Sequence, residues 1–303
     1  MTAAVTTASG GLTAPSRWNP VKRFARQYVR MPTGVAGLVV LVGFLVLALT
    51  APLYIGANNL DVTKVNGPLL APPSSAYWLG TDLPGRSVLL LTIWGSRASL
   101  SIGIIATVLT MILGTSIGLI AGHFQGAVSR VLMTITDWFI TLPSLPLAIS
   151  LAAIIGQGAT SITVAIAVTS WPATARLVRA QTLAVEARPF IERARALGAG
   201  NTQIMSRQVL PNVMPLVLVS STLTIAGAIL SETTLSFLGL GDPSTVSWGN
   251  MINQAFTTGA ITRGAWWYLL PPGIAIVLVV LGFTMTGRAV ENILNPRMVG
   301  ARS

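Results

Sequence analysis

Two carboxylic acids stand inside apolar stretches of the sequence, where chemistry on a transported solute could occur. Asp137 lies in the stretch 132–155 and Glu232 near the end of the stretch 213–235. A carboxylate at membrane depth can carry a proton or bind a substrate, as in a proton-coupled transporter. Alternatively, each acid lies within a turn or two of the end of its stretch and pairs with a group at the interface. We expect this structural role for both residues.

Little else in the sequence is suited to catalysis or to metal binding. The chain has no cysteine and a single histidine, His123, next to Gly122 and near Gln125, so we expect a solvated loop histidine and no metal site. The eight acidic residues are too scattered to form a paired-carboxylate site. No G-x-x-x-x-G-K-[ST] loop is present to bind ATP. The sequence therefore predicts a protein that is not an enzyme and binds no cofactor itself.

The composition is that of a membrane protein. The chain has 303 residues, a mean hydropathy of +0.71 and 9% charged residues, against about 25% in average soluble proteins. A spanning helix needs about 20 apolar residues. The sequence predicts an all-α polytopic fold, a membrane domain over 34–290, and six spans at 34–54, 98–121, 132–155, 160–177, 213–235 and 268–285.

The charge distribution predicts the orientation of these spans. With the N-terminus in the cytoplasm, 15 of the 19 Lys and Arg residues face inward, and only Lys64, Arg86, Arg97 and Arg263 face outward. Cytoplasmic loops carry such an excess of basic residues. Six spans then place both termini in the cytoplasm. The net charge of +11 is explained by topology, so nucleic-acid binding is not expected.

The chain ends are expected to be cytoplasmic, with a disordered tail over 1–18 and a second tail over 291–303. Residues 19–31 predict a short amphipathic helix, with Asn19 as its cap and Pro20 in its first turn. Such a helix could lie on anionic lipid headgroups. The basic run could equally serve only to orient the first span.

Gly114, Gly118 and Gly122 repeat at four-residue spacing in the second span. Small residues at this spacing allow another helix to approach closely. The partner could belong to the same subunit or to another one.

The loop 186–212 has the pattern of two short helices joined by a glycine turn. Pro189 can begin the first helix, in which Phe190, Ala194 and Leu197 share one apolar face. Gly198 stands where a left-handed residue would end this helix. A second helix is expected from Asn201 or Thr202 toward Leu210 and Pro211. An apolar face in a polar loop indicates a docking surface, for this chain's own spans or for a partner.

The loop resembles the cytoplasmic EAA loop of type I ABC importer permeases. Glu192, Arg193 and Ala194 stand at the EAA positions, Gly198 at the glycine, and Leu210 and Pro211 at the closing Leu-Pro. The sequence departs from the pattern at Arg193, where the family has Ala, and at Gln208, where it has Ile. The segments 79–103 and 231–252 and the ending NPRM at 295–298 are similar to C-type subunits of dipeptide and oligopeptide permeases.

The resemblance implies a set of partners in a bacterial cell membrane. A second homologous permease pairs with this chain, two ATPase subunits bind ATP and Mg²⁺ below it, and an extracytoplasmic substrate-binding protein delivers a di- or oligopeptide. The helix after Pro189 would be the coupling helix seated on one ATPase, and Glu232 would lie near the outer gate. The alternatives are a permease for nickel chelates or glutathione, and a proton-coupled secondary transporter.

Overall fold

A computed structural model describes residues 20–56 and 60–294. The tail 1–18, the cap Asn19, the NPRM segment and most of the tail 291–303 lie outside the described residues. The regular elements, in chain order, are α1 (Pro20–Val29), α2 (Pro32–Tyr54), α3 (Val88–His123), α4 (Ala127–Thr141), α5 (Ser144–Ile155), α6 (Ala159–Glu186), α7 (Pro189–Ala196), α8 (Asn201–Ile204), the π-helix η2 (Met205–Val209), α9 (Leu210–Phe237), α10 (Trp248–Thr257) and α11 (Trp266–Leu294).

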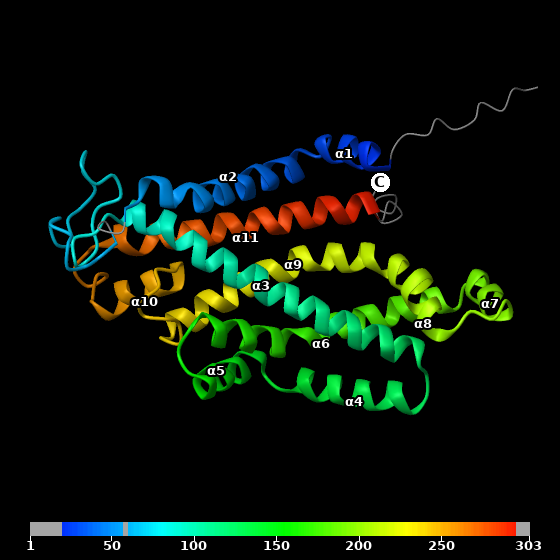
Figure 1. Ribbon diagram of the computed structural model, residues 1–303. Coiled ribbons are helices and arrows are strands. Elements are labelled where there is room, and N and C mark those ends of the chain that lie inside the picture. Colours follow the sequence, from blue (N-terminus) through cyan, green and yellow to red (C-terminus); the bar gives the residue numbers. More distant parts are fainter. Residues whose placement is uncertain (1–19, 57–59, 295–303) are drawn as a thin grey trace, which may run out of the picture.

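The long helices run side by side and form an elongated bundle (Figure 1). Within the described ranges, five helical segments are long and apolar enough to cross a membrane: α2, α3, α6, α11, and the continuous segment of α8, η2 and α9. The helix α3 passes diagonally through the bundle and packs most extensively against α6, while α2 packs against α11. The all-α polytopic class is confirmed.

The predicted third span, 132–155, is a bent pair of helices. It consists of α4 and α5, which meet at an angle of 94°. Leu142 has an extended backbone and Pro143 is the cap of α5. Because a proline disfavours helical geometry in the residue before it, the chain turns at Leu142. The count of six spans holds only when this bent pair is taken as one crossing.

The two ends of the bundle carry different elements. The helices α1, α7 and α8 and the last turn of α11 lie at one end, here called the inner end (Figure 1). The segment 60–87 and α10 lie at the opposite end, here called the outer end. The described ends of the chain therefore lie on the same side as the loop 186–212.

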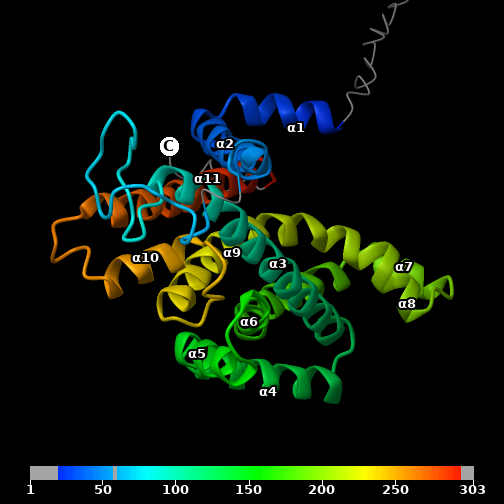
Figure 2. The ribbon, with the colours of Figure 1, turned by 60° about the vertical axis from the view of Figure 1, so that its left-hand side comes forward.

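The predicted amphipathic helix 19–31 appears as α1, which lies at an angle to α2 (Figure 2). Tyr28 is its buried side chain, and its hydroxyl donates to the Gly34 carbonyl at 2.8 Å. Lys22 and Arg23 are exposed. This arrangement leaves basic side chains at the surface of the inner end.

Candidate functional site

The helix α7 extends beyond the inner end of the bundle (Figure 1). Pro189 stands in its first turn, where a missing backbone N–H costs nothing. At its other end, Gly198 has φ +84°, and the Ala199 amide donates to the Ala194 carbonyl at 3.0 Å. This geometry is that of a left-handed helix C-cap, for which glycine carries no steric cost.

The faces of α7 differ from those expected. Ala194 is buried together with Ile191, and both belong to an apolar cluster with Val185, Ile204 and Val209. Phe190 is 37% exposed and Leu197 is 88% exposed. The expected apolar face of Phe190, Ala194 and Leu197 is therefore only partly buried against this chain. Ile191 and Ala194 attach α7 to its own subunit, whereas Leu197 is almost fully exposed and Phe190 is partly exposed.

A buried carboxylate that the sequence did not single out ties α7 to the bundle. Glu186, the last residue of α6, lies with Oε1 2.5 Å from His123 Nδ1 and accepts a bond from Arg195 of α7 at 2.6 Å. The side chains of Glu186 and His123 are 7% and 2% exposed. One acid thus joins the ends of α3 and α6 to the projecting helix.

The expectation of a solvated loop histidine at position 123 is wrong. The helix α3 continues through His123, and the ring packs edge-on against Phe124. The neighbours Gly122 and Gln125 suggested a turn, but the chain turns only after His123. An acid and a base 63 positions apart give no local sequence signal of their contact.

The second helix of the loop does not end at Leu210 and Pro211. Helix α8 passes through the π-helix η2 directly into α9, which places Pro211 in the first turn of α9. A proline inside an α-helix removes a hydrogen bond and collides with the carbonyl four residues earlier. The wider π turn before it accommodates this conflict, and such turns often occur at functional sites.

The three glycines of α3 pack within the subunit, which decides between the two alternatives. A methyl group at Gly114, Gly118 or Gly122 would lie 2.5 to 2.6 Å from atoms of Thr174, Ala175 or Thr182 on α6. Such distances are shorter than any relaxed contact. The glycines thus allow α3 and α6 to cross closely, and α6 ends in Glu186.

The two carboxylates inside apolar stretches have different surroundings. Asp137 on α4 bonds to Arg176 on α6 at 2.7 Å, and both side chains are about half exposed. Glu232 on α9 is fully buried and accepts a bond from the Ser236 hydroxyl at 2.9 Å. Asp137 therefore has the polar partner expected of a structural acid, while the partners of Glu232 are hydroxyl groups.

A second buried ion pair holds the outer end together. The guanidinium of Arg86 bonds to Asp82 at 2.7 Å and to the Leu60 carbonyl at 3.2 Å. It also reaches Gln254 of α10, which accepts a bond from the Tyr268 hydroxyl of α11. Burial raises the pKa of Asp82, and the charge of Arg86 opposes that rise. The segment 60–87 is thereby attached to α10 and α11.

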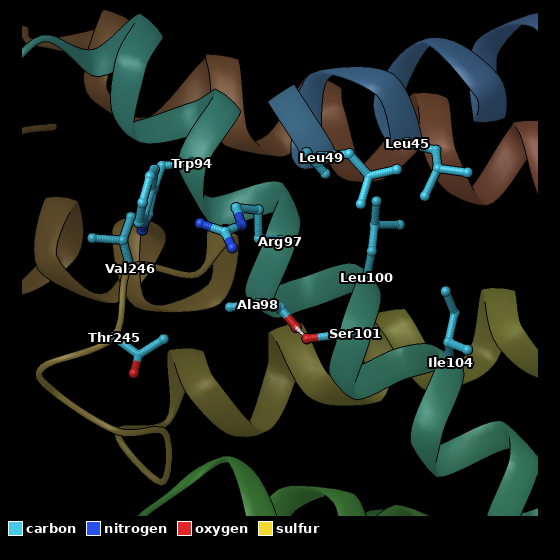
Figure 3. Close-up of a pocket in the computed structure, with 11 residues that line it drawn as sticks. Leu45, Leu49, Trp94, Arg97, Ala98, Leu100, Ser101, Ile104, Thr245 and Val246 are labelled. Carbon is cyan, nitrogen blue, oxygen red and sulfur yellow. Dashed lines mark hydrogen bonds between the residues drawn. The ribbon is translucent and has the colours of Figure 1, made fainter. Parts of the chain in front are cut away.

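A crevice of about 440 Å³ opens between α2, α3 and the loop that precedes α10 (Figure 3). The Arg97 guanidinium lies 4.6 Å from the centre of the Trp94 ring. Leu45 of α2 and Leu100 and Ile104 of α3 line the crevice on one side of Arg97, and Thr245 and Val246 line it on the other. Tryptophan and arginine together are typical of the level of lipid headgroups, which agrees with an interfacial position for the start of α3.

The chain is similar over most of its length to known permease proteins. The glutathione transport system permease protein GsiD of Pectobacterium atrosepticum is 36% identical over 91% of this chain and 90% of its own length. The dipeptide transport system permease protein DppC of Alkalihalophilus pseudofirmus is 33% identical over 94% of this chain and 92% of its own length. DppC of Bacillus subtilis is 33% identical over 90% and 84%.

The fold also has a counterpart among known structures. A chain of the methionine ABC transporter MetNI in an inward-facing conformation aligns with a TM-score of 0.53 and 20% identity. The alignment covers 67% of this chain and 97% of that one. Residues 114–300 match the family model described as the binding-protein-dependent transport system inner membrane component. This chain belongs to that family, as a multi-pass permease subunit of an ABC importer.

Proposed function

We propose that this permease imports di- or oligopeptides as part of a four-subunit transporter. A second homologous permease completes the pathway, and two ATPase subunits bind ATP and Mg²⁺ at the inner end. An extracytoplasmic binding protein delivers the substrate at the outer end. The peptide and dipeptide permeases among its relatives support this substrate class.

The coupling role of α7 rests on one observation. Leu197 is 88% exposed at the tip of a helix that extends beyond the bundle, and an apolar side chain in that position gains free energy by docking. The residues Pro189, Phe190, Glu192, Arg193, Leu197 and Gly198 form the projecting part of the coupling element. Ala194, Leu210 and Pro211 attach it to the bundle.

The helix also has the rigidity that coupling requires. Ile191 and Ala194 hold it through apolar contacts, and Arg195 holds it through Glu186. Glu186 in turn contacts the end of α3. A displacement of α7 therefore acts directly on α3 and α6, which cross closely at the three glycines.

Glutathione is the second candidate substrate, because two of the relatives are glutathione permeases. Proton-coupled transport through Asp137 has weaker support, since Asp137 is paired with Arg176 and half exposed rather than isolated in the interior. Substrate choice between peptides and glutathione is expected to depend on the binding protein as well as on the permease.

Uptake in proteoliposomes tests this proposal. We expect ATP and the binding protein together to drive dipeptide uptake by the reconstituted four-subunit complex. The Asp137→Asn variant should transport within about twofold of the wild type, because an exposed ion pair contributes roughly 0 to 1 kcal/mol. With ATP held constant, a protonophore should have no effect. Uptake that collapses with the proton gradient alone would favour the secondary-transporter alternative.

The orientation has its own test, which the absence of cysteine makes simple. Ser75 and Ser206 are exposed at opposite ends of the bundle. In intact cells an impermeant thiol reagent should label the Ser75→Cys variant and leave the Ser206→Cys variant unlabelled. Both should be labelled after the cells are opened. The reverse pattern in intact cells would contradict cytoplasmic termini.

A further inference from the structure

Glu232 is a buried carboxylate that has no ion-pair partner among the residues that the structure describes. It is fully buried near the outer end of α9. Ser236, one turn later, donates a hydrogen bond to it at 2.9 Å. An unpaired carboxylate at this depth is costly unless several donors surround it.

The further donors come from two other helices. Ser247 at the cap of α10 lines a small cavity together with Glu232, and the hydroxyl group of Ser99 on α3 also lies close to the acid. Each of these two oxygens accepts a backbone N–H at 3.2 Å, Ser99 from Trp248 and Ser247 from Asn250. Because each hydroxyl has one hydrogen of its own, it remains able to donate to the acid. Hydroxyl groups from α3, α9 and α10 thus surround the Glu232 carboxylate.

The start of α10 is suited to a negative charge and is packed tightly against its neighbours. The first turn of a helix carries a partial positive charge, and Glu232 lines a small cavity together with Ser247 and Asn250 of this turn. The Trp248 indole donates to the Thr92 carbonyl of α3 at 2.9 Å, and Asn253 donates to the Phe237 carbonyl of α9 at 2.6 Å. A methyl group at Gly249 would lie 2.5 Å from Ser236.

We propose that Glu232 is a positioning residue that fastens α10 to the outer ends of α3 and α9. The segment from Asn201 to Phe237 is one continuous helix of 37 residues, about 55 Å long at 1.5 Å per residue. Its inner end begins at the coupling element and its outer end carries Glu232 (Figure 1). A protein that binds against α10 at the outer end therefore displaces the same continuous helix whose inner end adjoins the coupling element. The signalling part of this inference rests on the proposed function. The attachment of α10 by Glu232 does not depend on it.

Hydrogen exchange in the purified complex tests the attachment. Glu232→Ala should accelerate amide exchange in residues 248–257 by about tenfold, as expected for the loss of a buried hydrogen bond. Ser236→Ala, which removes a hydrogen bond to Glu232 and leaves the cap of α10 intact, should act in the same direction while Glu232 remains in place, and it carries the test if Glu232→Ala does not fold. Thr234→Ala is the matched control, because Thr234 lies on α9 within the same turn but is only partly buried, and its hydroxyl donates to the Leu230 carbonyl of its own helix.

A second readout separates signalling from simple destabilisation. Basal ATPase activity should stay within twofold of the wild type in both variants, while stimulation by the binding protein falls at least fivefold. Glu232→Gln, which keeps the size but only one acceptor oxygen, should restore part of the stimulation. If amide exchange in α10 were the same in Glu232→Ala as in Thr234→Ala, the proposed attachment would be overturned. Full stimulation of the ATPase by the binding protein in Glu232→Ala would overturn the role of Glu232 in signalling. If the wild-type complex lacks an ATPase, the proposed function fails and the exchange result still stands.

Discussion

Replacing Leu197 with aspartate should release the ATPase subunits from the permease while leaving the permease inserted in the membrane. The side chain is 88% exposed and makes no contribution to the buried core of its own chain. Full burial of a leucine against a partner contributes roughly 1.5 to 3 kcal/mol. Aspartate loses this contribution and adds the cost of removing a carboxylate from water. We expect the affinity for the ATPases to fall by at least about 100-fold, since about 1.4 kcal/mol corresponds to a factor of ten.

Co-purification on a tagged permease measures this loss. Leu197→Ala should give an intermediate affinity. Leu53→Ala is the matched control, because Leu53 is 85% exposed on α2 and far from α7 (Figure 1). Glu192 is exposed in the first turn of α7. If it faces a basic group of the ATPase, Glu192→Lys should weaken the complex in the same way, since like charges at an interface cost several kcal/mol. Wild-type recovery of the ATPases with Leu197→Asp would exclude this tip as the docking surface.

Gly198→Val should uncouple transport from ATP hydrolysis. Gly198 has φ +84°, and no neighbouring atom lies within 4 Å of the position that a Cβ would take. The effect of valine is therefore purely one of backbone strain, roughly 1 to 3 kcal/mol for a side chain forced into this region. The chain can relieve the strain only by changing the angle at which it leaves α7. Binding-protein-stimulated ATPase activity should drop at least tenfold, while membrane insertion and pairing with the second permease persist.

Gly200 provides the control for this experiment. It lies two residues further along the same loop, has φ −73°, and also has open space around its Cβ position. Valine is sterically allowed there, so Gly200→Val should keep stimulation within about twofold of the wild type. An equal loss of ATPase stimulation in Gly198→Val and Gly200→Val would mean that any bulky residue in the loop impairs coupling. Full activity of Gly198→Val would show that the exit angle of α7 does not matter.

Much of the architecture follows from local properties of the chain. The lipid core accepts long apolar helices because their backbone groups are satisfied internally, so apolar length alone located α2, α3, α6, α9 and α11. The positive φ of Gly198 was also predictable, since glycine after an apolar helical face marks a C-cap. The boundaries were less accurate: α3 begins at Val88, ten residues before the expected start, because its first turns are buried against α10 rather than exposed to lipid.

Other features were decided only by the tertiary structure, because they depend on residues far apart in the chain. A helical periodicity shows that α7 has an apolar face but not which side packs inward, and Ile191 rather than Phe190 proved to be the buried anchor. The sequence could not reveal that His123 and Glu186 meet, or that Ser99 and Ser247 converge on Glu232. Likewise, the apolar length of the stretch 132–155 did not reveal that α4 and α5 meet at an angle of 94°. Local sterics and apolar length determined the elements, whereas the crossing of α3 and α6 and the docking of α10 determined which polar groups share a buried site.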